Sequence, residues 1–222
     1  MVKDKKLAII VPCYNEINTI LKLYNKIKNY GIPIIVDDCS NDGTQKLLDS
    51  KNINFIKNKK RSGYEQSIIN GINYVNKNLR KINFLATIDA DLELPPVNLL
   101  RLYKKAKKNN YDLVIGARKK LNRISEYLLS LYFKFRFKIE DPITGLKIYK
   151  ANKIKSIIKK VSNNFFLVDI LIFYFNKKYS FCSVKILPKK RKDYPRVGRS
   201  LAVNIKIIKI LFFCIFFRNR MN

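Results

Sequence analysis

The chain has 222 residues, of which 47% are hydrophobic, so it can bury a core and is too apolar to be intrinsically disordered. Its 46 lysines and arginines exceed its 16 acidic residues by 30, which favours a nucleic acid, an anionic membrane or a phosphorylated substrate as partner, unless codon bias toward lysine supplies the charge. The absence of histidine excludes histidine metal sites and Ser-His-Asp or Cys-His catalysis.

A chain of this length predicts one domain with room for a small appendage. The segment Met1–Leu7 is charged and leads straight into a strand-like run, so we expect no signal peptide. The cysteines show no C-x-x-C spacing and are too sparse for a disulfide scaffold, so we expect reduced thiols in a cytosolic setting. They are Cys13, Cys39, Cys182 and Cys214.

The first 118 residues alternate short apolar runs with segments of helical spacing. The apolar runs predict strands buried on both faces. They are Leu7–Val11, Ile32–Val36, Ile53–Ile56, Phe84–Ile88 and Leu113–Gly116. Helices are expected after Asn15, a candidate N-cap, at Thr44–Asp49, along a stripe at 68–75 and from Pro95-Pro96 onward. This alternation predicts an α/β fold with a mainly parallel sheet flanked by helices.

After Arg118 the pattern becomes more apolar and more basic. Ile124–Phe137 interleaves aromatic and basic side chains, and a basic loop, Pro188–Ser200, follows later. The other expected elements are strands at Leu146–Tyr149 and Phe181–Leu187 and an apolar helix at Phe165–Phe175.

The segment Leu201–Phe217 is apolar but carries Lys206 and Lys209. Its longest charge-free stretch is far below the ~20 residues that span a bilayer. It is either a helix packed on the core or an amphipathic helix on a membrane surface, with Arg218 and Arg220 meeting anionic head groups. The sequence leaves both alternatives open.

Polar residues follow the ends of the predicted strands. They are Asn15, Glu16, Asp37, Asp38, Asp89, Asp91 and Arg118. Because ligands of open α/β sheets bind outside the carboxyl ends of the strands, the sequence predicts a ligand site at this edge.

Asp89 and Asp91 are two residues apart, and Glu93 follows at the same spacing. Alternate side chains of an extended segment point the same way, and a hard divalent cation prefers oxygen ligands. An Asp-x-Asp at a strand end therefore suits a metal bound to a nucleoside diphosphate. The alternative is a solvated acidic loop, although this cluster is an acidic island in a basic chain.

A second polar segment, 37–44, also follows a buried strand. Gly43 permits a tight turn, and one aspartate can accept hydrogen bonds from a nucleobase or ribose. The alternative is an ordinary strand–turn–helix in which Asp42 or Thr44 caps the helix.

Four motifs, in this order and spacing, resemble the family 2 glycosyltransferases, which have the GT-A fold. They are Val-Pro-Cys-Tyr-Asn-Glu at 11–16, Val-Asp-Asp-Cys-Ser-Asn-Asp-Gly-Thr at 36–44, Asp-Ala-Asp at 89–91 and Asp-Pro-Ile-Thr-Gly-Leu-Lys at 141–147. The resemblance covers about residues 5–200, and the branch it is most similar to is the dolichol-phosphate or polyprenyl-phosphate sugar transferases.

The resemblance implies a Rossmann-like GT-A domain at 1–200, with a donor half at 1–118 and an acceptor half at 119–200. The basic and apolar residues at 201–222 predict an amphipathic C-terminal helix. The resemblance also implies roles for single residues. Pro12, Tyr14, Glu16, Asp37, Asp38 and Asp89 would bind the donor nucleotide, with Asp38 on the base and Asp37 alongside. Asp89, Asp91 and Glu93 would hold Mg²⁺ or Mn²⁺.

The implied catalytic residues are Asp91, Asp141 and Arg118. The implied ligands of an acceptor phosphate are Arg118, Arg196, Arg199 and Ser200. Three positions depart from the family pattern and weaken the assignment of donor and acceptor. Cys39 stands where relatives have a small residue, 61–67 differs from the usual Asn- and Gly-rich segment, and Leu171 replaces a frequent second acid after Asp169.

The implied activity is metal-dependent, inverting transfer of a sugar from a GDP-mannose or UDP-glucose type of donor to a polyprenyl or dolichyl phosphate. We expect the protein on the cytosolic face of an anionic membrane, or in the cytoplasm if the C-terminal helix packs on the core. No nucleic-acid partner is expected, and a membrane-protein partner or a homo-oligomer is left open. One alternative is transfer to a glycan or protein hydroxyl, with Asp141 as general base. The other is a non-catalytic RNA- or lipid-binding protein.

Overall fold

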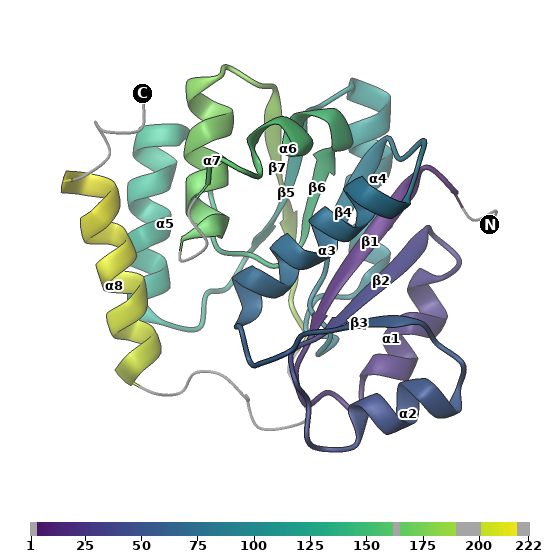
Figure 1. The fold of residues 1–222 in the computed structure, drawn as a ribbon. Helices are drawn as coiled ribbons and strands as arrows, with labels where there is room; N and C mark the ends of the chain where they lie inside the picture. Colours follow the sequence, from purple (N-terminus) through teal and green to yellow (C-terminus); the bar gives the residue numbers. More distant parts are fainter. Residues whose placement is uncertain (1–3, 162–164, 190–200, 217–222) are drawn as a thin grey trace.

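The part of the chain that the structure describes forms a seven-stranded sheet with helices on both faces (Figure 1). The computed structural model describes residues 4–161, 165–189 and 201–216. The strands are β1 (Leu7–Cys13), β2 (Ile32–Asp37), β3 (Phe55–Lys57), β4 (Phe84–Thr87), β5 (Leu113–Arg118), β6 (Lys147–Lys150) and β7 (Phe181–Ile186). The helices are α1 (Ile20–Ile27), α2 (Thr44–Ser50), α3 (Tyr64–Asn78), α4 (Pro96–Asn109), α5 (Ile124–Phe137), α6 (Ala151–Ile157), α7 (Phe166–Asn176) and α8 (Leu201–Phe216).

The strand order is β3-β2-β1-β4-β6-β5-β7, and β6 alone runs antiparallel to its two neighbours. The mainly parallel α/β sheet expected from the sequence is therefore confirmed. Because β6 runs antiparallel to β4, β6 starts at the edge of the sheet where β1, β2 and β4 end, and the segment before β6 lies at this edge. The motif at 141–147 thus meets the motifs of the donor half at one edge.

The central strand β1 shows why the strands are continuous apolar runs. Ala8 and Ile10 belong to the core on one face, whereas Ile9 and Val11 belong to the core on the other. All four side chains have no exposed surface. Since successive side chains of a strand point to opposite faces, a strand covered on both sides must be apolar at every position.

The prediction that Asn15 caps the first helix was wrong. The helix begins at Ile20, after a turn in which the carbonyl of Glu16 accepts hydrogen bonds from the N–H groups of Thr19 and Ile20. Asn15 instead has a left-handed backbone (φ 55°), and its side chain bonds Asn41 in both directions at 2.9 Å. It therefore fastens the loop after β1 to the loop after β2.

Helix α8 lies beside α5, on the left of the molecule in Figure 1. Its buried side chains, Ile207, Ile210 and Cys214, join the same core as α5 and α7. Within the described ranges, no helix combines the length and the apolar run that crossing a membrane requires.

Candidate active site

A pocket of about 380 Å³ opens at the edge of the sheet where β1, β2 and β4 end. Its wall comes from all three of these strand ends, from the start of α3 and from α8. The lining residues are Pro12, Cys13, Tyr14, Glu16, Asp38, Arg61, Gly63, Tyr64, Ser67, Asp89, Ala90, Asp91 and Lys206. Six of the residues predicted to bind a donor or metal therefore share one pocket: Pro12, Tyr14, Glu16, Asp38, Asp89 and Asp91.

One side of the pocket carries an aromatic ring and a cation. The guanidinium of Arg61 lies over the ring of Tyr14, with 4.1 Å between its central carbon and the ring centroid. Such a planar pair combines a hydrophobic surface with hydrogen-bond donors. This side of the pocket therefore suits a flat, polar group such as a nucleobase.

Asp38 lines the same pocket and shapes the loop that carries Arg61. Its Oδ1 accepts hydrogen bonds from Ser62 N and Asn58 Nδ2, both at 2.8 Å, and its Oδ2 accepts one from Gly63 N at 2.8 Å. The side chain is nearly buried. Asp38 thus lies where the prediction placed it, but these described bonds order the loop at 58–63, a role that the sequence did not suggest.

Asp37 is also at the strand end but does not line the pocket. It has no exposed surface, and its Oδ2 accepts hydrogen bonds from Ser40 N at 3.0 Å and Gln45 Nε2 at 2.5 Å. These bonds hold the turn between β2 and α2. The structure therefore gives Asp37 a supporting position, and direct contact with a donor stays a prediction.

Asp89 and Asp91 form the acidic corner of the pocket. Tyr64 donates its hydroxyl hydrogen to Asp89 Oδ1 at 2.6 Å, and Asp91 Oδ1 accepts a hydrogen bond from Glu93 N at 2.9 Å. Gly145 lies directly against Asp89, because a Cβ atom added there would be 2.1 Å from Asp89 Oδ1. The carbonyl of Gly145 is fixed by a 2.7 Å hydrogen bond from Thr87 Oγ1, so the glycine of the 141–147 motif makes room for this carboxylate.

The charge of this corner fits a divalent cation. Burial, and then repulsion by Asp91, raise the pKa of Asp89 to about 6. A cation beside two carboxylates removes such a penalty, and Mg²⁺ typically takes one or two carboxylates together with substrate phosphates. Within the described residues no set of three acidic or sulfur side chains is placed to hold a metal, so Glu93 as a third ligand stays a prediction.

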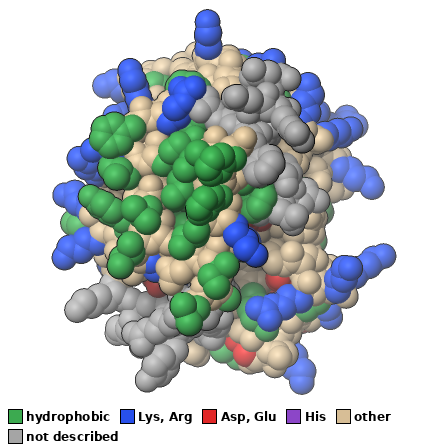
Figure 2. Space-filling model, turned by 90° about the vertical axis from the view of Figure 1, so that its left-hand side faces the viewer, with side chains coloured by type: hydrophobic (Ala, Val, Ile, Leu, Met, Phe, Trp, Pro, Cys, Tyr) green, Lys and Arg blue, Asp and Glu red, His purple; other side chains and the backbone are tan. Residues whose placement is uncertain are grey.

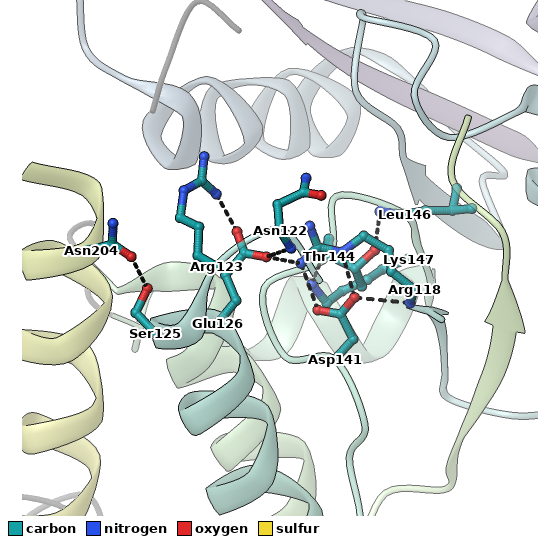
Figure 3. A network of polar contacts seen from close by, with 10 residues as sticks. All are labelled: Arg118, Asn122, Arg123, Ser125, Glu126, Asp141, Thr144, Leu146, Lys147 and Asn204. Carbon is teal, nitrogen blue, oxygen red and sulfur yellow. Dashed lines mark hydrogen bonds and ion pairs between the residues drawn. The ribbon is translucent and has the colours of Figure 1, made fainter. Parts of the chain in front are cut away.

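A buried ionic network joins the end of β5 to α5 and to the loop before β6 (Figure 3). Arg118 donates Nε to Asp141 Oδ2 at 2.7 Å and Nη2 to Asp141 Oδ1 at 3.1 Å, and its Nη2 lies 3.5 Å from Glu126 Oε2. Glu126 also forms an ion pair with Arg123. Burial opposes the charge of Arg118, but Asp141 and Glu126 outweigh this effect and raise its pKa. Arg118 is therefore a fixed cation whose charge also acts on Asp89.

Sequence reasoning missed two cations of the site. Lys147, on β6, has no exposed surface and donates its Nζ to the carbonyl of Thr144. Lys206, on α8, lines the pocket, and its Nζ lies 3.6 Å from Glu65 Oε1 at the start of α3. A lysine within the 141–147 motif was a visible signal for the first. No local pattern points to the second, which is brought in by tertiary packing.

Asp141 does not lie in the pocket, where a general base would be needed. It has no exposed surface, does not line the pocket, and both its carboxylate oxygens accept hydrogen bonds from Arg118. A base must reach the proton that it removes. The predicted phosphate ligands Arg196, Arg199 and Ser200 lie outside the described residues.

The comparison with known families decides the identity of this site. The model for glycosyl transferase family 2 matches residues 8–165. The chain belongs to this family. The expected enzyme class is therefore confirmed, and the pocket is that of a family 2 glycosyltransferase.

Relatives of this glycosyltransferase include enzymes named for lipid phosphates. An uncharacterized protein of Methanocaldococcus jannaschii is 29% identical, over 67% of this chain and 73% of its own. A dolichol-phosphate mannosyltransferase of Pyrococcus furiosus is 31% identical over 51% of this chain, and an undecaprenyl-phosphate 4-deoxy-4-formamido-L-arabinose transferase of Photorhabdus laumondii is 31% identical over 52%. This chain spans only 33% and 37% of those two enzymes.

Solved structures confirm the fold. Glucosyl-3-phosphoglycerate synthase of Mycobacterium tuberculosis, crystallised with Mn²⁺, UDP-glucose and glycerol 3-phosphate, matches 93% of this chain with a TM-score of 0.70 at 13% identity. The same enzyme with UDP covers 94% of this chain at 14% identity and a TM-score of 0.70. The GT-A fold expected from the sequence is thus the fold of this glycosyltransferase.

Proposed function

We propose that this glycosyltransferase moves a sugar from a nucleoside diphosphate sugar to a polyprenyl phosphate at the cytosolic face of a membrane. The observation that carries the proposal is the arrangement of charge around the pocket. The carboxylates of Asp89 and Asp91 line the pocket, and the cation Arg118, held by Asp141, is near enough to Asp89 to oppose the rise of its pKa. The names of two relatives, which act on dolichol phosphate and undecaprenyl phosphate, support the choice of acceptor.

The donor fits the pocket in a definite direction. Tyr14 and Arg61 provide the surface for the base, with Asp38 ordering the loop that carries Arg61. The diphosphate then extends to Asp89 and Asp91, where Mg²⁺ or Mn²⁺ would be held and would neutralise the charge of the leaving group. Tyr64 orients Asp89, and Gly145 leaves the space that Asp89 occupies.

The reaction is a single displacement at the anomeric carbon. A phosphate oxygen of the acceptor forms the new bond to this carbon, the bond to the β-phosphate oxygen breaks, and the nucleoside diphosphate leaves with the electron pair. A phosphate monoester is already anionic at neutral pH and needs no base. Asp141, the carboxylate predicted as base for a hydroxyl acceptor, has no exposed surface, which favours an acceptor that needs no base.

Product partitioning tests the proposal. Radiolabelled GDP-mannose or UDP-glucose is incubated with polyprenyl phosphate and Mg²⁺ or Mn²⁺, and we expect label in the organic phase. Asp91→Ala should lower this label by about 100-fold or more, because charge on the leaving group is left uncompensated. Asp49→Ala, an exposed position on α2, is the matched control and should leave activity unchanged.

Two other outcomes would replace the proposal. Label that stays in water on a glycan or phosphorylated small molecule would assign the enzyme to hydroxyl acceptors. Steeply salt-dependent binding to RNA, with no affinity for any nucleotide sugar, would instead indicate a non-catalytic binding protein.

A further inference from the structure

Helices α5 and α8 together expose a broad apolar face (Figure 2). Of the fifteen large hydrophobic side chains exposed in the described structure, eleven lie on these two helices. Those on α5 are Ile124, Tyr127, Leu128, Leu131 and Phe135, and those on α8 are Leu201, Ile205, Ile208, Phe212, Ile215 and Phe216. Such a concentration is unusual for a surface that faces only water.

Hydrogen bonds and ring contacts hold α8 against α5 and the rest of the domain. Tyr132 on α5 donates its hydroxyl hydrogen to the carbonyl of Cys214 at 3.0 Å, and Ser125 Oγ donates to Asn204 Oδ1 at 2.6 Å. The rings of Phe165 and Phe213 stack with centroids 5.0 Å apart. One side of α8 is therefore packed on the core, as one of the two alternatives expected, while its other side is exposed.

A groove of about 510 Å³ runs between the two helices within this face. Leu131 and Phe135 form its α5 wall, Leu211 and Ile215 form its α8 wall, and Arg136 lies at its border. The walls of the groove are thus apolar, and Arg136 adds a positive charge to its lining.

The exposed charges on the two helices have one sign. Lys134 and Arg136 on α5 and Lys206 and Lys209 on α8 are exposed. The only acid in the two helices is Glu126, which is 2% exposed and paired with arginines. Aromatic and aliphatic side chains flanked only by cations are what the interface of an anionic bilayer attracts.

We propose that the α5–α8 face binds the surface of an anionic lipid bilayer. A second copy of the chain fits less well, because pairing two such faces brings lysines and arginines together in a protein of net charge +30. The inference deepens the proposed function by assigning its membrane surface to named residues, and α5 contributes as much as the C-terminal helix.

Lys206 connects the α5–α8 face to the donor pocket. Lys206 lines the donor pocket from α8, the same helix whose Ile205 and Ile208 point outward into the α5–α8 face. The mouth of the pocket therefore lies beside the membrane-binding surface. A phosphate at the level of the lipid head groups reaches the pocket without leaving the bilayer, a consequence that rests on the proposed lipid acceptor.

Vesicle flotation without any sugar donor tests the surface itself. The full chain should float with phosphatidylcholine vesicles that contain phosphatidylglycerol and should float weakly with phosphatidylcholine alone. The variant Phe135→Ser with Phe212→Ser should lower binding by tenfold or more, whereas Tyr74→Ser with Val97→Ser, exposed positions on α3 and α4, should bind like the wild type. Circular dichroism confirms that each variant is folded.

A charge-reversal pair tests the electrostatic part. Lys134→Glu with Lys209→Glu should weaken binding to the anionic vesicles by at least fivefold for each lysine. The control is Lys104→Glu with Lys108→Glu, which makes the same change of net charge at exposed positions on α4. Equal loss in both pairs would overturn the assignment, since it would reflect net charge alone. A wild type that does not bind anionic vesicles, or that uses the face to dimerise in light scattering, would overturn it as well.

The outcome separates this inference from the proposed function. Vesicle binding that depends on Phe135 and Phe212, without any lipid-linked product, would leave the surface standing and remove the lipid acceptor. Product in the organic phase, with vesicle binding unaffected by the two serine substitutions, would support the lipid acceptor and remove the α5–α8 face as the membrane surface.

Discussion

Arg118 and Asp141 form a two-point ion pair, with Nε to Oδ2 at 2.7 Å and Nη2 to Oδ1 at 3.1 Å, and the backbone N–H of Arg118 donates a third bond to Oδ2 at 3.1 Å. The Asp141 side chain has no exposed surface and that of Arg118 is 14% exposed. The pair locks the end of β5 to the loop that precedes β6. Asp141 therefore fixes the direction of the Arg118 guanidinium, and any effect of Asp141 on transfer is expected to act through Arg118.

Asp141→Asn should destabilise the fold and lower activity together. The substitution leaves the Arg118 guanidinium buried without its main counter-charge, which costs about 3–5 kcal/mol of unfolding free energy. Denaturant unfolding measures this cost. Lys107→Ala breaks the exposed pair with Asp4 and should cost only about 0–1 kcal/mol. A cost for Asp141→Asn as small as that of Lys107→Ala would show that the pair does not hold the loop.

Asp89→Asn should abolish transfer and yet stabilise the protein in the absence of metal and donor. The pKa of Asp89 is raised to about 6, above the ordinary 3.8, so its charged form opposes folding above pH 6. We expect the variant to gain about 1–3 kcal/mol at pH 7.5, at about 1.4 kcal/mol for each pKa unit.

The gain from Asp89→Asn must depend on pH. It is complete above pH 6 and fades as pH falls from 6 toward 3.8, because the wild-type carboxyl then takes up a proton in the folded state and loses its penalty. Melting temperatures of both proteins across this range measure the effect. A gain that is constant with pH would contradict the assignment of the penalty to this carboxyl.

Gly145→Ala should damage the donor site more than the fold. A Cβ atom at this position would lie 2.1 Å from Asp89 Oδ1, so Asp89 must turn away and lose its 2.6 Å hydrogen bond from Tyr64. We expect weaker binding of the nucleotide sugar, measured by calorimetry, and a small change in melting temperature. Tyr64→Phe removes only the hydrogen bond and should cost less affinity than Gly145→Ala. The opposite order would show that the glycine is not there for Asp89.

The donor half of the site was predictable because its signals are local. Each strand of that half is an apolar run that ends in polar residues, and the carboxyl ends of parallel strands meet at one edge. Pro12, Asp38 and Asp91 reach the pocket by this rule alone. The sequence pattern also predicted β6, but not its antiparallel place between β4 and β5, since strand order depends on long-range pairing.

The features that sequence reasoning missed are contacts between distant segments. Arg61 meets the ring of Tyr14, and Lys206 reaches Glu65 from the end of the chain. Asn15 follows a strand as a helix cap would, but its side chain is used by Asn41 in the neighbouring loop. In each case the local pattern allows several partners, and tertiary packing selects one of them.

Lys147 should lower the stability of the protein, because a fully buried lysine carries its charge at a cost. Burial lowers its pKa to about 8 from 10.5, against the attraction of Asp141 and Asp89. Below pH 8 the folded protein carries the buried charge, so Lys147→Met should be more stable than the wild type. Between pH 8 and 10.5 the unfolded wild type binds more protons than the folded one, so the stability of the wild type rises with pH relative to that of Lys147→Met.

Lys147→Arg is the control, because arginine does not titrate in this range, and it should share the pH dependence of Lys147→Met. Denaturant unfolding from pH 7 to 9.5 measures all three proteins, and a wild type parallel to both variants would show that Lys147 does not titrate there. Both variants should also transfer sugar more slowly, because the lysine balances carboxylates beside the reaction site.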